Sequence, residues 1–139
     1  KSTNFMGGGA RYVTFRDSAI RNTAKQAFIF TLDYNDPNAK LDYKRSTVAG
    51  QFRDITVSDV SVENARTAAI EVKGDSGHGA WHQGLVFERV RFSGPAPVKI
   101  DGLKDSRFDG LRFTETGGAN PWQVQGSQGL AYTDVEPAP

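Results

Sequence analysis

The sequence of 139 residues contains no cysteine, which excludes disulfide bridges, thiolate catalysis and cysteine-based zinc sites. No apolar run approaches the roughly 18 residues that a membrane-spanning helix requires. The formal net charge is only +1, whereas nucleic-acid-binding proteins normally carry a strong basic excess on one face. We therefore expect neither a membrane nor a nucleic acid as a partner.

Helical periodicity is nearly lacking as well. No long window keeps apolar residues at the spacing of a helical face without an intervening glycine or proline, and the chain has 15 glycines and 6 prolines. Short runs of alternating apolar and polar residues dominate instead, which is typical of β-strands. The sequence therefore predicts an all-β protein.

Four segments of the chain superimpose without gaps. Their positions 1, 3, 6 and 8 are mostly apolar, with Ser18 and Ser106 as exceptions. The segments are Val13–Asn22, Ile55–Asn64, Leu85–Gly94 and Ser106–Glu115. Strict alternation would put positions 3 and 6 on opposite faces of a strand, so this pattern indicates two short strands joined by a sharp bend.

A further apolar strand follows each of these repeats. These strands are Phe28–Leu32, Ala68–Val72, Val98–Ile100 and Trp122–Val124. Three short strands in each repeat predict a right-handed parallel β-helix of about four coils in a single domain over residues 1–139. The polar segments 35–48 and 74–84 are expected to be inserted loops, which often build the binding face of a solenoid. Residues 126–139 break the repeat and are expected to form an irregular terminal tail.

The competing interpretation is a β-sandwich, which also has short strands separated by turn signals. The recurring register of the four repeats favours the solenoid. Solenoid ends need caps, and residues 1–10 run directly into the first repeat without one. We therefore expect this chain to be the C-terminal part of a longer β-helix, whose missing N-terminal coils would stack on the first repeat.

The first third of the chain carries a family resemblance. Lys1-Ser-Thr is followed by the glycine cluster Gly7–Gly9, by a Val13-Thr-Phe-Arg-Asp17 strand and by an apolar strand that ends in Asp33-Tyr34. This arrangement resembles polygalacturonases, glycoside hydrolases of which the bacterial exo-acting enzymes are most similar. The resemblance implies a parallel β-helix and hydrolysis of α-1,4-galacturonan with inversion, in a secreted or periplasmic bacterial protein without a cofactor.

The resemblance also assigns residues. Lys1 corresponds to the lysine of the family's Arg-Ile-Lys motif, which contacts a galacturonate carboxylate, and Tyr34 to an aromatic residue of the cleft. Lys40, Lys44 and Arg45 are weaker candidates because they lie in the first inserted loop. The family's catalytic aspartates precede the Arg-Ile-Lys motif, so we expect no catalytic residue in this chain and no activity from it in isolation.

Several other residues favour structural roles. Gly77-His78-Gly79 resembles a family motif but follows Lys1 instead of preceding it, so His78 is expected to be a loop histidine. His78 and His82 could chelate zinc only on a helix, which the glycines make improbable, and we expect no metal site. Asp17, Asp54, Asp59 and Asp109 are expected beside the bends of the coils, and Trp81 and Trp122 in packing.

Other functional classes stay open. The chain could be a non-catalytic solenoid module that binds acidic polysaccharide or a protein partner. It could also come from another β-helical protein, such as a phage tailspike or a pectate lyase. A calcium-dependent lyase would need a cluster of carboxylates on one strand face, and the sequence shows none, so this alternative ranks last.

Overall fold

The computed structural model describes residues 1–2, 7–34 and 48–139. Apart from the short 3-10 helix η1, the elements of this part of the chain are β-strands. They are β1 (Gly9–Arg21), β2 (Gln26–Thr31), β3 (Gln51–Glu63), β4 (Ala68–Lys73), η1 (Ser76–His78), β5 (His82–Ser93), β6 (Val98–Asp101), β7 (Leu103–Asp109), β8 (Arg112–Thr114), β9 (Trp122–Gln125) and β10 (Gln128–Thr133).

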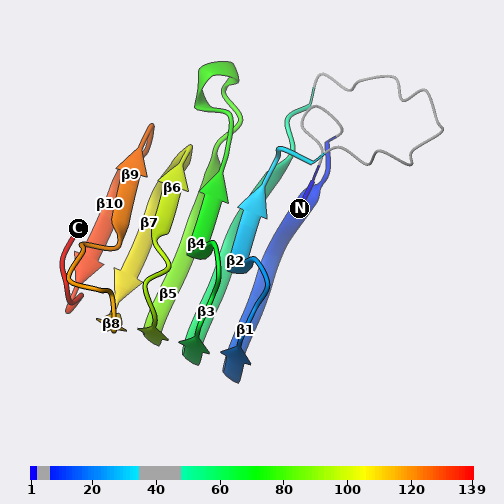
Figure 1. Cartoon of the computed structure of the whole chain (residues 1–139). Coiled ribbons are helices and arrows are strands. Elements are labelled where there is room, and N and C mark those ends of the chain that lie inside the picture. Colours follow the sequence, from blue (N-terminus) through cyan, green and yellow to red (C-terminus); the bar gives the residue numbers. More distant parts are fainter. Residues whose placement is uncertain (3–6, 35–47) are drawn as a thin grey trace.

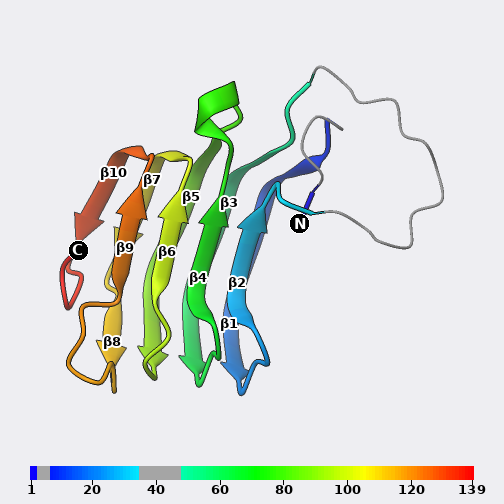
Figure 2. The ribbon, with the colours of Figure 1, turned by 45° about the horizontal axis from the view of Figure 1, so that its top comes forward.

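The strands form two sheets in which every pair of neighbouring strands is parallel. The first sheet has the order β1-β3-β5-β7-β10, with β8 paired to β5, and the second has the order β2-β4-β6-β9. The chain alternates between the sheets, so successive coils lie side by side from the N-terminal to the C-terminal end (Figures 1 and 2). This is the predicted parallel β-helical architecture, and the exclusively parallel pairing excludes the sandwich.

The long strands of the first sheet bend at matching places. Backbone φ is positive at the fifth position of all four repeats, with values of 52° at Asp17, 55° at Asp59, 51° at Arg89 and 64° at Gly110. Single residues in this conformation reverse the alternation of faces, which is why positions 3 and 6 both point inward. Two further columns of positive φ lie before and after these bends. One contains Tyr12, Asp54, Gly84, Asp105 and Gly129, and the other contains Asn22, Asn64, Gly94 and Glu115.

All four aspartates expected beside the bends therefore lie there. Asp17, Asp54 and Asp59 have positive φ themselves, and aspartate tolerates that conformation better than most residues. Asp109 precedes its bend by one residue, because Gly110 takes the left-handed position.

The interior between the sheets is apolar and rich in stacked aromatic rings. Phe87 is fully buried, and its ring stacks on that of Phe108 with a centroid distance of 5.7 Å. Phe108 stacks in turn on Tyr132 at 5.3 Å. Parallel, in-register strands place equivalent side chains directly above one another, so each coil extends the same apolar column.

The two ends of this column differ. At the C-terminal end, the Trp122 ring packs against Phe108 and Tyr132, and its Nε1–H donates to the carbonyl oxygen of Pro137 at 2.9 Å. The expected packing role of Trp122 is thereby confirmed. Within the expected tail, β10 pairs with β7 and starts a partial fifth coil, a more regular ending than predicted.

At the N-terminal end, the apolar side chains of the first coil remain exposed. Val13 is 42% exposed and Phe15 is 40% exposed, whereas Val57 and Phe87 of the following coils are 2% and 0% exposed. An open apolar hollow of about 400 Å³ lies there, between β1 and β2.

Candidate functional site

The structure brings the two strongest sequence-predicted residues together. Tyr34 follows the end of β2 and is 41% exposed, and the Lys1 ammonium lies 5.7 Å from the centroid of its ring. The backbone N–H of Ser2 donates to the carbonyl oxygen of Thr31 at 2.9 Å and holds the Lys1–Ser2 segment beside β2. An ammonium, an aromatic face and a phenolic hydroxyl thus meet at one place on the surface, and these groups suit a sugar that carries a carboxylate.

A second cation lies next to this pair. The Lys73 ammonium, at the end of β4, contacts a carboxylate oxygen of Asp33 at 2.5 Å, and this contact raises the pKa of Lys73. The Asp33 backbone N–H donates to the Thr31 hydroxyl at 2.9 Å, which orients the residue. Asp33 therefore links Tyr34 to the neighbouring coil.

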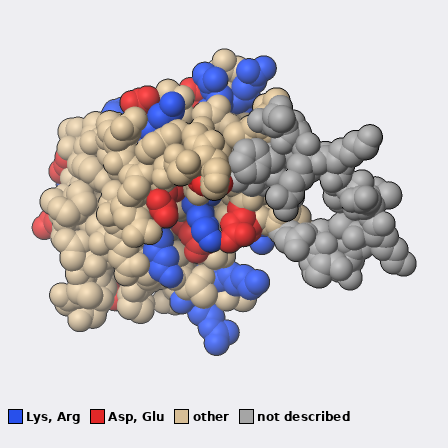
Figure 3. Space-filling view, turned by 90° about the horizontal axis from the view of Figure 1, so that it is seen from above, with Lys and Arg blue, Asp and Glu red and all other residues tan. Residues whose placement is uncertain are grey.

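Sequence reasoning did not assign a role to Asp33 or Lys73. The available signal was the position of each residue in the sequence. Asp33 follows the apolar residues of β2 in the first coil, and Lys73 follows those of β4 in the second coil. Figure 3 looks onto the end of the molecule at which β2, β4 and β6 finish, and it shows basic and acidic side chains close together there.

A groove runs from Lys73 over the outer face of the second sheet. Its volume is about 370 Å³, and it crosses β4, β6 and β9. The polar residues that line it are Glu71, Lys73, Lys99, Asp101, Gln123 and Gln125. Two rows of side chains in register form this lining, because Glu71, Lys99 and Gln123 are cross-strand neighbours, as are Lys73, Asp101 and Gln125.

The weaker candidates Lys40, Lys44 and Arg45 lie outside the described residues. Their expected contribution to the binding of an anionic polymer stays a prediction.

The two histidines have separate structural surroundings. His82 is fully buried; its Nδ1 accepts a hydrogen bond from the Phe52 N–H at 3.1 Å, and its Nε2–H donates to the Lys73 carbonyl at 3.1 Å. Burial lowers the pKa of His82 to about 4, with a smaller contribution from the nearby terminal ammonium, so the imidazole is neutral near pH 7. His78 lies in η1, where its Nδ1 is 2.9 Å from a carboxylate oxygen of Asp75.

The expected loop position of His78 is therefore correct. In residues 1–2, 7–34 and 48–139, no group of three or more potential metal ligands gathers. No helix in the same part of the chain is long and apolar enough to cross a membrane.

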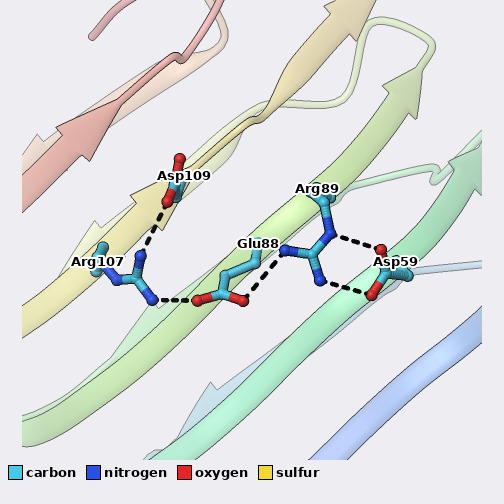
Figure 4. A network of polar contacts seen from close by, with 5 residues as sticks. All are labelled: Asp59, Glu88, Arg89, Arg107 and Asp109. Atoms are coloured by element: carbon cyan, nitrogen blue, oxygen red, sulfur yellow. Dashed lines mark hydrogen bonds and ion pairs between the residues drawn. The ribbon is translucent and has the colours of Figure 1, made fainter.

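A network of ion pairs covers the outer face of the first sheet (Figure 4). Arg89 holds both carboxylate oxygens of Asp59, at 2.7 and 2.8 Å. Arg107 contacts Glu88 and also Asp109, the latter at 2.9 Å. The Arg89 hydrogen bonds lower the pKa of Asp59, so this carboxylate is ionised near neutral pH. The network links three coils.

Comparison with known proteins shows which proteins this chain is similar to. No family model matches the chain. The exo-poly-alpha-D-galacturonosidase of Dickeya chrysanthemi is 41% identical over 126 residues, which are 88% of this chain and 21% of that protein. A solved structure of a family 28 exopolygalacturonase from Yersinia enterocolitica superimposes with a TM-score of 0.82 at 41% identity, over 94% of this chain and 23% of that one.

The chain is homologous to a segment of the exopolygalacturonases. This relation agrees with the resemblance in the sequence and with the parallel β-helical architecture. The chain spans about a fifth of the length of these relatives.

Glycoside hydrolysis normally needs a pair of carboxyl groups on either side of the scissile bond, one of them able to donate a proton. Asp59, Glu88 and Asp109 each contact an arginine, and Asp33 contacts Lys73. These contacts give the four carboxylates structural partners.

Proposed function

We propose that this chain is the C-terminal β-helical segment of an exo-polygalacturonase-like hydrolase and supplies part of its galacturonan-binding cleft. The parent enzyme would hydrolyse α-1,4-galacturonan with inversion, using aspartates that precede this segment. The contact between Lys1 and Tyr34 carries the proposal, because the resemblance assigns both residues to substrate binding and they lie 5.7 Å apart. The 41% identity to two exo-acting enzymes supports it.

An activity assay tests whether the catalytic residues lie in the segment that precedes this chain. The 139-residue chain and a longer polypeptide that carries it with preceding coils are each incubated with polygalacturonate, and new reducing ends are measured. We expect release of reducing ends from the longer polypeptide only. Activity of the 139-residue chain alone would contradict the assignment of the catalytic residues to the preceding segment.

The open N-terminal end supports the same proposal. Val13 and Phe15 are 42% and 40% exposed at positions whose equivalents in the next coils are buried, and such an apolar face is normally covered. We propose that preceding coils of the same polypeptide cover it. Because polygalacturonate is a polymer found outside the cell, the parent protein would be secreted or periplasmic.

A non-catalytic module that binds acidic polysaccharide is the second candidate. The ion pairing of Asp33, Asp59, Glu88 and Asp109 favours it, since a module without hydrolytic function needs no free carboxyl pair. A longer polypeptide that binds polygalacturonate and releases no reducing ends would support this alternative over the hydrolase.

A further inference from the structure

The outer face of the first sheet is hollowed beside the bends of its strands. The hollow has a volume of about 720 Å³, which lies in the range of small-ligand sites. One row of cross-strand neighbours runs through it, from Ala19 on β1 and Ser61 on β3 to Arg91 on β5 and Arg112 on β8. The side chains of this row change from small to large between β3 and β5, which leaves the surface low over β1 and β3.

Arg91 stands on this row beside another arginine. It is exposed on β5 and lies directly opposite Arg112 in the parallel register. Like charges directly opposite each other on a sheet are destabilising. Arg112 is held by the chain itself, because it donates to a carboxylate oxygen and to the carbonyl oxygen of Asp134, at 2.6 and 2.5 Å. The Arg91 guanidinium makes no hydrogen bond or ion pair within the described part of the chain.

Elsewhere on this face, arginines are paired with an acid of the neighbouring coil. These pairs are Arg21–Glu63, Arg89–Asp59 and Arg107–Glu88. Arg91 departs from the pattern, since its neighbour on β3 is Ser61, at the place where an acid would complete a pair. A local departure of this kind, without a compensating contact among the described residues, is typical of a functional position.

The groups around Arg91 favour a ligand with one negative charge and several hydroxyl groups. A guanidinium presents a planar fork that binds a carboxylate through two parallel hydrogen bonds. The Ser61 hydroxyl has no hydrogen-bond partner among the residues that the structure describes. Asp17, on the rim, lies 3.5 Å from Arg16 Nε and is largely exposed, so its carboxylate can accept hydrogen bonds from hydroxyl groups.

The acids around the hollow argue against a densely charged ligand. Asp17, Asp59 and Asp134 all line it, and they would repel an acidic peptide that carries a carboxylate on every residue. A uronic acid carries one carboxylate and several hydroxyl groups on each ring, so it matches both the free arginine and the surrounding acceptors.

We propose that this hollow is an accessory binding site for galacturonan, separate from the Lys1–Tyr34 pair. The Arg91 guanidinium binds the carboxylate of one galacturonate, and the sugar ring lies over Ala19 and Ser61 with its hydroxyl groups toward Ser61 and Asp17. This inference rests on the proposed function and adds a second place at which the segment holds the polymer. Because the hollow belongs to the first sheet, it would bind a separate stretch of polymer and keep the enzyme attached to it.

Titration of the isotope-labelled 139-residue chain with digalacturonate, followed by nitrogen–proton NMR, tests the site and shows whether each variant folds. We expect the amide signals of Ser61, Arg91 and Arg112 to shift with one common dissociation constant. Arg91→Gln should raise this constant about fivefold to tenfold at low salt. Arg91→Lys should raise it about threefold, because lysine keeps the charge and loses the planar fork.

Arg66→Gln is the matched control. Arg66 is also an exposed arginine whose side chain has no hydrogen bond or ion pair among the described residues, but it lies between β3 and β4 and does not line the hollow. Its replacement should leave the dissociation constant at the hollow unchanged. An equal rise in Arg66→Gln and Arg91→Gln would reduce the effect to net charge and overturn the site.

Hexaglutamate serves as the competing probe. We expect it to shift the Ser61 and Arg91 signals only at higher concentrations than digalacturonate does. Tighter binding of hexaglutamate than of digalacturonate would assign the hollow to an acidic peptide and overturn the proposal.

The position of the shifted signals separates this inference from the proposed function. If signals around Tyr34 shift while those of Ser61 and Arg91 do not, the hollow is not a binding site and the proposed function stands. If signals around Arg91 shift and those around Tyr34 do not, the accessory site stands and the Lys1–Tyr34 pair loses the binding role on which the proposed function depends. If neither set shifts in a folded chain, both are wrong.

Discussion

The ammonium of Lys1 lies over the ring of Tyr34, with 5.7 Å between the nitrogen and the ring centroid. These residues lie far apart in the sequence and meet because Ser2 is hydrogen-bonded to Thr31 at the end of β2. A cation–π contact of this kind keeps the ammonium beside the aromatic ring. The two side chains therefore form a single feature of the surface.

Replacement of Tyr34 should weaken the binding of galacturonate oligomers. We expect Tyr34→Ala to raise the dissociation constant about fivefold, because it removes both the aromatic face and the hydroxyl, and Tyr34→Phe to raise it about twofold. Isothermal titration calorimetry measures both values.

Tyr12 offers a matched control for this substitution. It is 73% exposed and lies beside a cation in the same way, with the Arg11 guanidinium carbon 5.5 Å from its ring centroid. It belongs to the first sheet, away from the groove. Tyr12→Ala should leave affinity unchanged, and a loss equal to that of Tyr34→Ala would mean that any tyrosine–cation pair on the surface contributes.

His82 should make the fold sensitive to mild acid. Its pKa is about 4 in the folded chain and about 6.5 in the unfolded chain, so the unfolded state binds more protons between these values. The free energy of unfolding should therefore fall as the pH drops from 6.5 to 4, by up to about 3 kcal/mol, and this contribution should then level off.

Urea denaturation at a series of pH values measures this dependence. His82→Gln should be less stable at pH 7 and should lose most of the slope between pH 4 and 6.5. His78→Gln, which changes an exposed histidine in η1, should keep the wild-type slope. A slope that survives in His82→Gln would assign the acid sensitivity to other groups.

Two glycines with the same backbone conformation should differ in their tolerance of alanine. Gly102 and Gly110 have φ of 70° and 64°, so either substitution places an alanine in the left-handed region at a cost of about 1–2 kcal/mol. A Cβ on Gly102 would also lie 2.8 Å from the Cα of Gly74, whereas one on Gly110 would meet no atom closer than 3.5 Å.

We therefore expect Gly102→Ala to destabilise the fold by at least about 1 kcal/mol more than Gly110→Ala, because two backbones must move apart. Chemical denaturation of the two variants under the same conditions gives the comparison. Equal losses would mean that the coils around Gly74 separate at little cost.

Phe15 and Phe87 should report whether the open end is covered in a longer polypeptide. Phe87→Ala removes a fully buried ring and should cost about 3–5 kcal/mol in either context. Phe15 is 40% exposed, so Phe15→Ala should cost clearly less in the 139-residue chain. When preceding coils are present, we expect the cost of Phe15→Ala to approach that of Phe87→Ala. An unchanged cost would mean that they do not stack on β1.

The sequence predicts the coils well because their pattern is local. The apolar positions of the four repeats define which side chains point inward, and the change of phase at the fifth position predicts the bend found at Asp17, Asp59, Arg89 and Gly110. Neither feature depends on distant parts of the chain. The regular ending at β10 was not predicted, because residues 126–133 are rich in glycine and polar residues and pair through the free edge of β7.

The candidate site was predictable only in part. Lys1 and Tyr34 follow from the resemblance, but the contact between Asp33 and Lys73 depends on the register between β2 and β4. Residues 32–67 separate those strands, and no local pattern determines which residues will face each other across this interval.

The three columns of positive φ have a consequence for how such a protein can change in length. Each coil turns at the same three places, so an insertion or deletion inside a strand would shift one bend out of line with those above and below it. Loops between strands escape this constraint, and so does the gain or loss of a complete coil. Variation in this architecture should therefore occur in whole-coil steps or in the connecting loops, and engineered variants with an added coil should fold only when the duplicated unit begins and ends in the same column.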